Sequence, residues 1–227
     1  MLMFIAAVGP ALALLLYFYL RDKYEKEPFK LLAAAFLLGV LIVVPALIIE
    51  VLISPRNSIF TSIMSRWLTV GYTSFIVAGL VEEGLKYLAF SVFIYKKQQF
   101  NEMYDGIIYA VFVSLGFATI ENIVYVINQG FAVALTRALT AVPAHALFGA
   151  TMGYYFGRAK FGGPHGKSAL LSLALFVPVI LHGIYDFILL SQNLLILLLF
   201  IPYIVILWIR VLKQIKQLSS QSPFRYK

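Results

Sequence analysis

Two carboxylates and an amine interrupt a stretch of the sequence that is otherwise apolar enough to cross a membrane as a helix. They lie in Val81-Glu82-Glu83-Gly84-Leu85-Lys86, where Lys86 follows the carboxylates by four and three residues and can reach either on one helix face. A charged residue near a bilayer centre costs about 2.5–3.5 kcal/mol, whereas an apolar residue returns only about 0.3–0.6 kcal/mol. Partners inside the protein must make up that deficit, so the cluster is either a functional site or an ion pair that holds the bundle together.

Three further polar groups lie within apolar runs: Glu121-Asn122, His145, and His182 with Asp186. His182 and Asp186 are four residues apart, so the carboxylate can orient the imidazole or both can face one ligand. Structural roles are the alternative, because an intramembrane Asn often joins helices and a lone His is often a packing residue. Glu50 at the end of its span, Asp105 as an N-cap and His165 in a loop are expected to lie outside the site.

The charge balance of these groups points to chemistry. Four carboxylates and one amine at membrane depth leave three negative charges without compensation, which burial does not tolerate. Either carboxylates are protonated, as in a general acid or base, or the histidines are charged, or a metal ion is bound.

The composition defines the surroundings of this cluster. Hydrophobic residues make up 62% and charged residues 12% of the 227 residues, which indicates a polytopic membrane protein. The net charge of +8 comes from basic residues between apolar runs, so it indicates membrane-flanking charges and no nucleic-acid partner. Cysteine is absent, which excludes disulfides, thiolate metal ligands and a Cys nucleophile.

About seven membrane-spanning helices are expected, each near the 20 or so residues needed to cross the hydrocarbon. Alternate connections and the tail hold fourteen Lys and Arg residues, against three (Arg56, Arg66 and Arg137) in the others. This asymmetry predicts an outer N-terminus and a cytoplasmic C-terminus. The fold is therefore an all-α bundle in a single integral membrane domain, 1–227, with a frayed basic cytoplasmic tail from about 213. The expected spans are Met1–Leu20, Leu31–Ile53, Val70–Tyr95, Gly106–Ile127, Ala138–Gly157, Ser168–Leu190 and Leu194–Leu212.

Within this topology the four polar sites converge on the outer half of the membrane. Carboxylates and imidazoles there suggest an activated water, with a Glu as base for attack on an amide and a His that stabilises the oxyanion. The same residues could relay charge in a proton- or cation-coupled transporter, or only assemble a non-catalytic scaffold.

The polar runs together resemble the PrsW family of intramembrane proteases. The similar runs are Phe75–Lys86, Tyr104–Tyr109, Ser114–Asn122, Arg137–His145 and Leu181–Phe187, and the opening Tyr17–Pro28 extends the resemblance over nearly the whole chain. The resemblance implies a bacterial cytoplasmic-membrane enzyme that makes the first cut in a single-pass anti-sigma factor, RsiW in the best-known case, during envelope stress. That cut lies on the extracytoplasmic side. The wider group includes CAAX prenyl-protein endopeptidases and bacteriocin-processing enzymes.

Transferred to matching positions, the resemblance assigns Glu82 as the general base and Glu83 as its partner. His145 would assist the water, and His182 with Asp186 would bind the oxyanion or orient the site.

Three other matched residues depart from the wider group and are expected to support the site. Lys86 replaces the Arg of the motif E-E-x-x-x-R and stands one residue nearer, and Glu121-Asn122 stands where that group has F-x-x-x-H.

The sequence is compatible with either a zinc-bound or a metal-free enzyme. His145 and His182, joined by Glu82 or Glu121, could hold zinc with a position left open for water. Because no H-E-x-x-H motif is present and the wider group is glutamate-dependent, the favoured expectation is a glutamate-type enzyme without a metal.

Overall fold

A computed structural model describes residues 2–55, 65–163 and 165–225, and the regular structure in these ranges is helical throughout. Met1, Arg56 and Lys227, which entered the sequence-based topology, lie outside the described residues. The expected all-α polytopic fold is confirmed. Within the described ranges six helical stretches are long and apolar enough to cross a membrane: Met3–Arg21, Phe29–Ile53, Met103–Gln129, Phe131–Phe161, Lys167–Leu190 and Leu194–Ser220.

The predicted span Val70–Tyr95 is helical but is divided into three parts. α3 (Arg66–Tyr72) leads into the π-helix η3 (Thr73–Leu80), and α4 (Val81–Phe93) follows. The backbone stays right-handed at both junctions, with φ −60° and ψ −46° at Tyr72 and φ −66° and ψ −52° at Val81. The three parts therefore form one continuous helix with a π-helical middle.

Two helices form the centre of the bundle. α5 (Met103–Gln129) is buried without interruption from Tyr104 to Thr119, and α7 (Ala141–Phe161) from Ala144 to Gly157. They make the most extensive helix pair in the protein. A Cβ on Gly153 would overlap the carbonyl of Gly106, so the two backbones touch where side chains would otherwise separate them.

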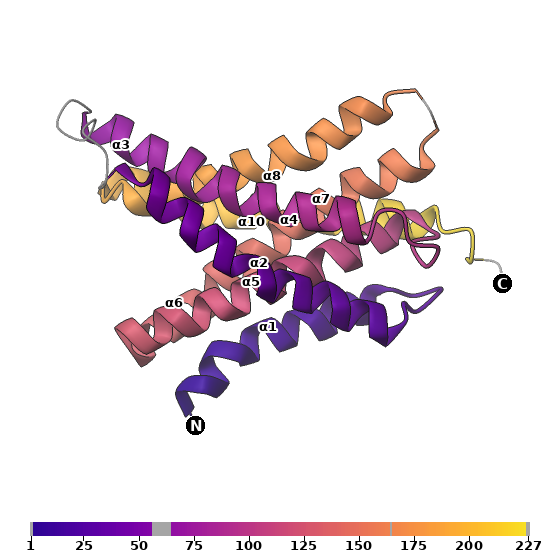
Figure 1. Ribbon diagram of the computed structural model, residues 1–227, viewed down its shortest axis with the longest axis horizontal. Helices are drawn as coiled ribbons and strands as arrows, with labels where there is room; N and C mark the ends of the chain where they lie inside the picture. Colours follow the sequence, from indigo (N-terminus) through magenta and orange to yellow (C-terminus); the bar gives the residue numbers. More distant parts are fainter. Residues whose placement is uncertain (1, 56–64, 164, 226–227) are drawn as a thin grey trace.

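The outer helices surround this pair and expose apolar faces. α1 (Leu2–Arg21) and α2 (Phe29–Ile53) pack against α5, whereas α8 (Lys167–Leu190) packs against α7 and η3. α1, α2 and α10 (Phe200–Ser220) expose many Leu, Ile and Phe side chains, as expected of faces that contact lipid. In Figure 1, α1 and α6 lie on one side of the view and α8 lies on the opposite side.

The helices differ from the sequence-based expectation in three places. α6 (Phe131–Leu139) is a separate helix, because Thr140 breaks the chain with φ −122° and ψ −76° before α7 begins. α9 (Leu194–Leu197) is a single turn that precedes α10. The prediction of a frayed tail after Leu212 is wrong for residues 213–220, because α10 continues to Ser220.

The extension of α10 has a simple cause. Leu207, Val211, Ile215 and Leu218 recur every three or four residues and are all buried, so one apolar stripe crosses the predicted boundary. The intervening Lys213 and Lys216 lie on the exposed face and concealed this stripe in a count of charges.

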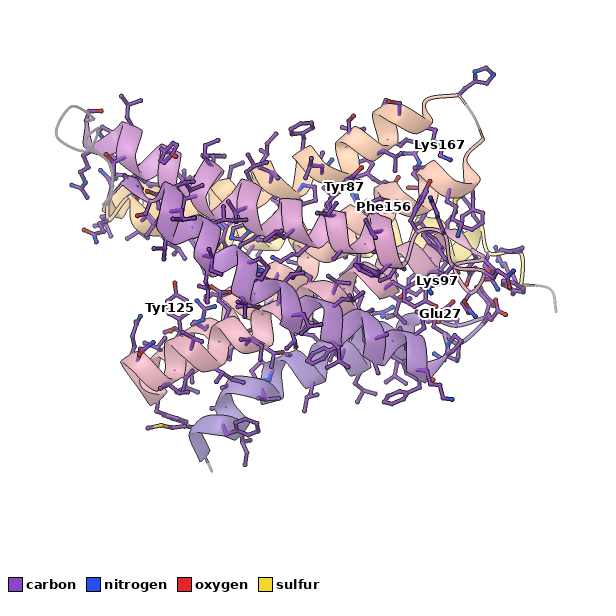
Figure 2. All side chains as sticks on the ribbon, viewed as in Figure 1. Glu27, Tyr87, Lys97, Tyr125, Phe156 and Lys167 are labelled. Atoms are coloured by element: carbon purple, nitrogen blue, oxygen red, sulfur yellow. The ribbon has the colours of Figure 1, made fainter. Side chains whose placement is uncertain are left out.

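The two ends of the bundle carry different connections. The α1–α2, α4–α5 and α7–α8 connections and the C-terminus gather at one end, on the right in Figure 1. Glu27, Lys97 and Lys167 are labelled at that end in Figure 2. These are the connections that the sequence predicts to share the cytoplasmic side.

Candidate active site

The motif Glu82-Glu83 lies at the start of α4, directly after the π-helix η3. π-helical turns are rare and are frequent at functional sites. A Cβ on Gly79 would lie 3.0 Å from the carbonyl oxygen of Val179, and one on Gly183 would overlap the ring of Phe75. These glycines let η3 pack closely on α8, which places α4 beside the histidine of that helix.

Lys86 lies at the centre of the acidic motif. Its ammonium nitrogen Nζ is 2.7 Å from Oε1 of Glu83, 3.2 Å from Oε2 of Glu82 and 3.1 Å from Nδ1 of His145. The side chain is 1% exposed, so this cation offsets buried negative charge where water cannot.

His145 on α7 is held from both sides. An ammonium only donates, so Nδ1 accepts from Lys86, and Nε2–H donates to Oε2 of Glu121 at 2.9 Å. Nη2 of Arg137 on α6 lies 3.0 Å from the same Glu121 oxygen. The chain Arg137–Glu121–His145 fixes the tautomer and the ring orientation of the imidazole.

His182 on α8 lies between two carboxylates. Its Nδ1 is 3.0 Å from Oε1 of Glu83, and its Nε2 is 3.5 Å from Oδ2 of Asp186. The rings of His145 and His182 are 5.3 Å apart, edge to face, and Phe148 stacks on His182 at 5.1 Å. The two imidazoles therefore share one small volume with the motif on α4.

A cavity of about 620 Å³ opens onto this cluster. Glu82, Glu121, His145, His182 and Asp186 line it, together with apolar side chains of α2, η3 and α5. Glu82 is 6% exposed at the cavity wall, whereas Glu83 lies behind the wall and is fully buried. The adjacent carboxylates thus have different access to a ligand.

Two residues of the candidate site were not predicted from the sequence. Arg137, which was assigned to a connection, lines the cavity and pairs with Glu121. Glu50, which was expected to reach water at the end of its span, also lines the cavity. It is the only charged residue between Leu31 and Ile53, the same signal that identified Glu82. Arg137 adds one positive charge to the site and Glu50 one negative charge, so the excess of negative charge is unchanged.

Asn122 is fully buried but does not line the cavity. Its Nδ2 donates to the carbonyl of Ala7 at 2.7 Å, and its Oδ1 accepts from Nε of Arg137 at 2.9 Å. Asn122 thus ties α5 to α1 and holds Arg137 in position. The prediction that Asp105 is the N-cap of α5 is wrong in position, because Glu102 is the N-cap and Asp105 is the N3 residue of the same capping box. Oδ2 of Asp105 accepts from the backbone N–H groups of Asn101 and Glu102.

The donor atoms of the site suit a divalent metal ion. One ligand atom from each of Glu82, Glu83, His145 and His182 can be chosen so that all lie within 4.8 Å of one another, and all four residues are buried. Imidazole nitrogens and carboxylate oxygens are the donors of catalytic zinc sites. The sequence suggested Glu121 as an alternative ligand. In the structure Glu121 instead accepts from Nε2 of His145, the nitrogen that does not face Lys86. A metal-bound histidine commonly donates its other N–H to a carboxylate in this way.

Comparison with known proteins agrees with this geometry. Residues 27–211 match the family described as PrsW family intramembrane metalloprotease. The chain is 40% identical over 215 residues to Protease PrsW of Bacillus subtilis (strain 168), which covers 95% of this chain and 94% of that protein. It is 42% identical over 220 residues to Protease PrsW of Oceanobacillus iheyensis, with 96% of each chain covered.

Protease PrsW of Clostridioides difficile (strain 630) is 39% identical over 211 residues, 91% of this chain and 87% of that protein. No solved structure gives a significant match. These matches identify a multi-pass bacterial membrane peptidase, which decides against a transporter or a scaffold. The chain belongs to the PrsW family of intramembrane proteases.

Proposed function

We propose that the protein is an endopeptidase that cuts a single-pass membrane regulator, of the anti-sigma factor class, near the extracytoplasmic surface. The observation that carries this proposal is the cavity in which Glu82, His145 and His182 meet at membrane depth. Glu121 on α5 is eight residues before the end of that helix, about 12 Å along its axis. The cavity thus lies towards the end of the bundle opposite to the basic connections, which the positive-inside rule assigns to the outer leaflet.

Glu82 is the proposed general base. It reaches the cavity, where it can take a proton from water as the oxygen attacks the peptide carbonyl carbon, and then pass that proton to the leaving amine. Glu83 has no access to the cavity, and it holds Lys86 and His182 in position instead. This assignment separates the roles of the two adjacent carboxylates.

The histidines have different proposed roles. Glu121 holds Nε2 of His145, so the ring is fixed with Nδ1 4.0 Å from Oε2 of Glu82. In the reaction, Nδ1 would accept from the attacking water in place of Lys86, which orients that water beside Glu82. His182 Nε2 faces the cavity beside Asp186, where an N–H can donate to the oxyanion that forms on the substrate carbonyl.

The description of the family as metalloproteases and the geometry of the four buried donors favour a bound divalent ion over the metal-free alternative. His145 Nδ1, His182 and Glu83 would hold it in place of the hydrogen bonds that Lys86 donates to His145 and Glu83, with Glu82 at the cavity as base. His182 would then be a ligand and would not donate to the oxyanion. Such an ion lowers the pKa of a bound water and polarises the carbonyl.

Reconstitution tests the proposal. In liposomes that contain a single-pass anti-sigma factor, the wild-type protein is expected to cut the substrate, and Glu82→Gln is expected to lower the rate constant at least 100-fold. Glu25→Gln, at the opposite end of the bundle, serves as the matched control with normal rate. Cleavage at the wild-type rate by Glu82→Gln would refute the assignment of the base, and ion flux without cleavage would refute the function.

A further inference from the structure

A second cavity, of about 500 Å³, lies at the end of the bundle that is opposite to the active site. It is formed where α1 and its following connection meet the last turns of α10. Four basic residues line it, namely Arg21, Lys23, Lys216 and Arg225, and the hydroxyls of Ser219 and Ser220 lie among them. No carboxylate occurs among the described residues that line this cavity.

Asp22, the acidic residue next to Arg21, offsets little of this positive charge. Asp22 follows Arg21 in sequence, yet its side chain is 1% exposed and does not line the cavity. Burial raises the pKa of Asp22 to about 7, which reduces its negative charge near neutral pH. Lys26, whose Nζ donates to the backbone carbonyls of Tyr19 and Asp22, points away from the cavity lining.

The end of the chain completes the cavity. After α10 the backbone turns, with the N–H of Arg225 donating to the carbonyl of Ser222 at 3.4 Å. The guanidinium of Arg225 donates to the carbonyl of Ser220, also at 3.4 Å. The sequence indicated a frayed tail here, whereas the structure folds residues up to 225 against the cavity.

The position of the cavity selects the ligand. Arg21 is the last residue of one helix that can span a membrane, and Lys216 lies in the last turns of another. Leu212 and Ile215 form an apolar part of the wall below the cations, towards the membrane. Cations above an apolar wall at the end of two spanning helices match a phosphate group with acyl chains beneath it.

We propose that this cavity binds a phosphate-bearing anion, presented by the headgroup of an acidic phospholipid at the membrane surface or by a soluble phosphate ester. The site is separate from the proteolytic cavity and does not depend on the proposed reaction. Its cations and hydroxyls supply the donors that phosphate oxygens accept.

Lipid binding to delipidated protein in detergent tests the proposal, with native mass spectrometry as the readout. Wild-type protein is expected to bind one added phosphatidylglycerol molecule and to bind phosphatidylcholine at least tenfold more weakly. Loss of two cations in Arg21→Gln/Lys216→Gln is expected to weaken phosphatidylglycerol binding about 30-fold. The matched control is Lys96→Gln/Lys97→Gln, which removes the same charge from exposed residues at the same end and is expected to bind normally.

Glycerol 3-phosphate distinguishes the two sources of the anion. Weak competition by this ester indicates that the acyl chains contribute and the ligand is a lipid, whereas competition at equal affinity indicates a soluble ester. A second measurement uses only the wild-type protein, so it remains informative if a variant fails to fold. In it, phosphatidylglycerol is expected to protect Lys216, but not Lys96, from amine acylation. Equal binding by both double variants, or equal protection of both lysines, would overturn the proposal.

Discussion

Nζ of Lys86 lies 3.1 Å from Nδ1 of His145, so a buried amine from α4 and an imidazole from α7 are hydrogen-bonded to each other. This contact decides the tautomer of the histidine, because only an unprotonated Nδ1 can accept from an ammonium. It also joins the two helices that carry the proposed base and its water-orienting partner.

Replacement of Lys86 with Met shortens the side chain by one atom and removes its charge. Glu82 and Glu83 then lose their buried cation, so the free energy of unfolding is expected to fall by about 3–5 kcal/mol. Thermal unfolding in detergent measures this, with exposed Lys96→Met as the control. An unchanged unfolding midpoint for Lys86→Met would contradict the ion-pair arrangement.

Arg137→Gln is expected to lower the cleavage rate constant about 10- to 100-fold, because Glu121 loses the cation that holds it on His145. The effect is expected on kcat more than on KM, with partial recovery in Arg137→Lys. Arg66→Gln is the control, since Arg66 pairs with the carbonyl of Ser191 and does not line the cavity. A change in KM alone would assign Arg137 to substrate binding.

The metal proposal predicts one zinc per chain in purified active protein. Chelation is expected to remove the metal and the activity together, and His182→Ala is expected to lower the zinc content by itself. Elemental analysis after size-exclusion chromatography measures the content without an activity assay. Full activity in protein free of zinc and other divalent metals would restore the metal-free mechanism.

Stability is expected to decrease between about pH 4 and pH 7 because of buried carboxyls in the α1–α2 connection. Burial raises the pKa of Asp22 from 3.8 to about 7 and that of Glu27 from 4.5 to about 7. Both bind protons more tightly when folded, so their stabilisation is complete below about pH 4 and is lost as the pH rises through 7.

Asp22→Asn isolates this effect. The variant cannot ionise at this position, so its free energy of unfolding is expected to vary less with pH, by an amount on the order of a few kcal/mol. Thermal scans of both proteins at several pH values measure the difference. Parallel pH profiles would show that Asp22 does not contribute.

Gly153→Ala is expected to destabilise the protein by about 1–3 kcal/mol, because the added methyl meets the backbone of α5. Gly71→Ala is the matched control, since a Cβ there has no neighbour within 4 Å. Unfolding in detergent compares the two variants. Equal midpoints would mean that α5 and α7 are farther apart than described.

The sequence predicted the helical bundle because long uncharged runs leave few alternatives in a membrane. It also singled out Glu82, Glu121, His145, His182 and Asp186, which line the cavity, since a charge in an apolar run requires a partner, but it missed Glu50 and Arg137. It could not pair them, because the contact of Arg137 with Glu121 depends on the turn at Gly130, with φ 86°, between α5 and α6. The place of Lys86 between three acceptors likewise depends on how α7 packs against α4.

The glycine contacts between α5 and α7 have a consequence for how a substrate enters. Backbones that touch cannot move apart without losing that packing, so this pair forms a fixed half of the enzyme. α2, α6 and η3 line much of the remaining wall of the cavity. α8 lines it as well, through His182, Tyr185, Asp186, Leu189 and Leu190. Admission of a peptide from the lipid would therefore require α2, α6, η3 or α8 to move against a rigid α5–α7 platform.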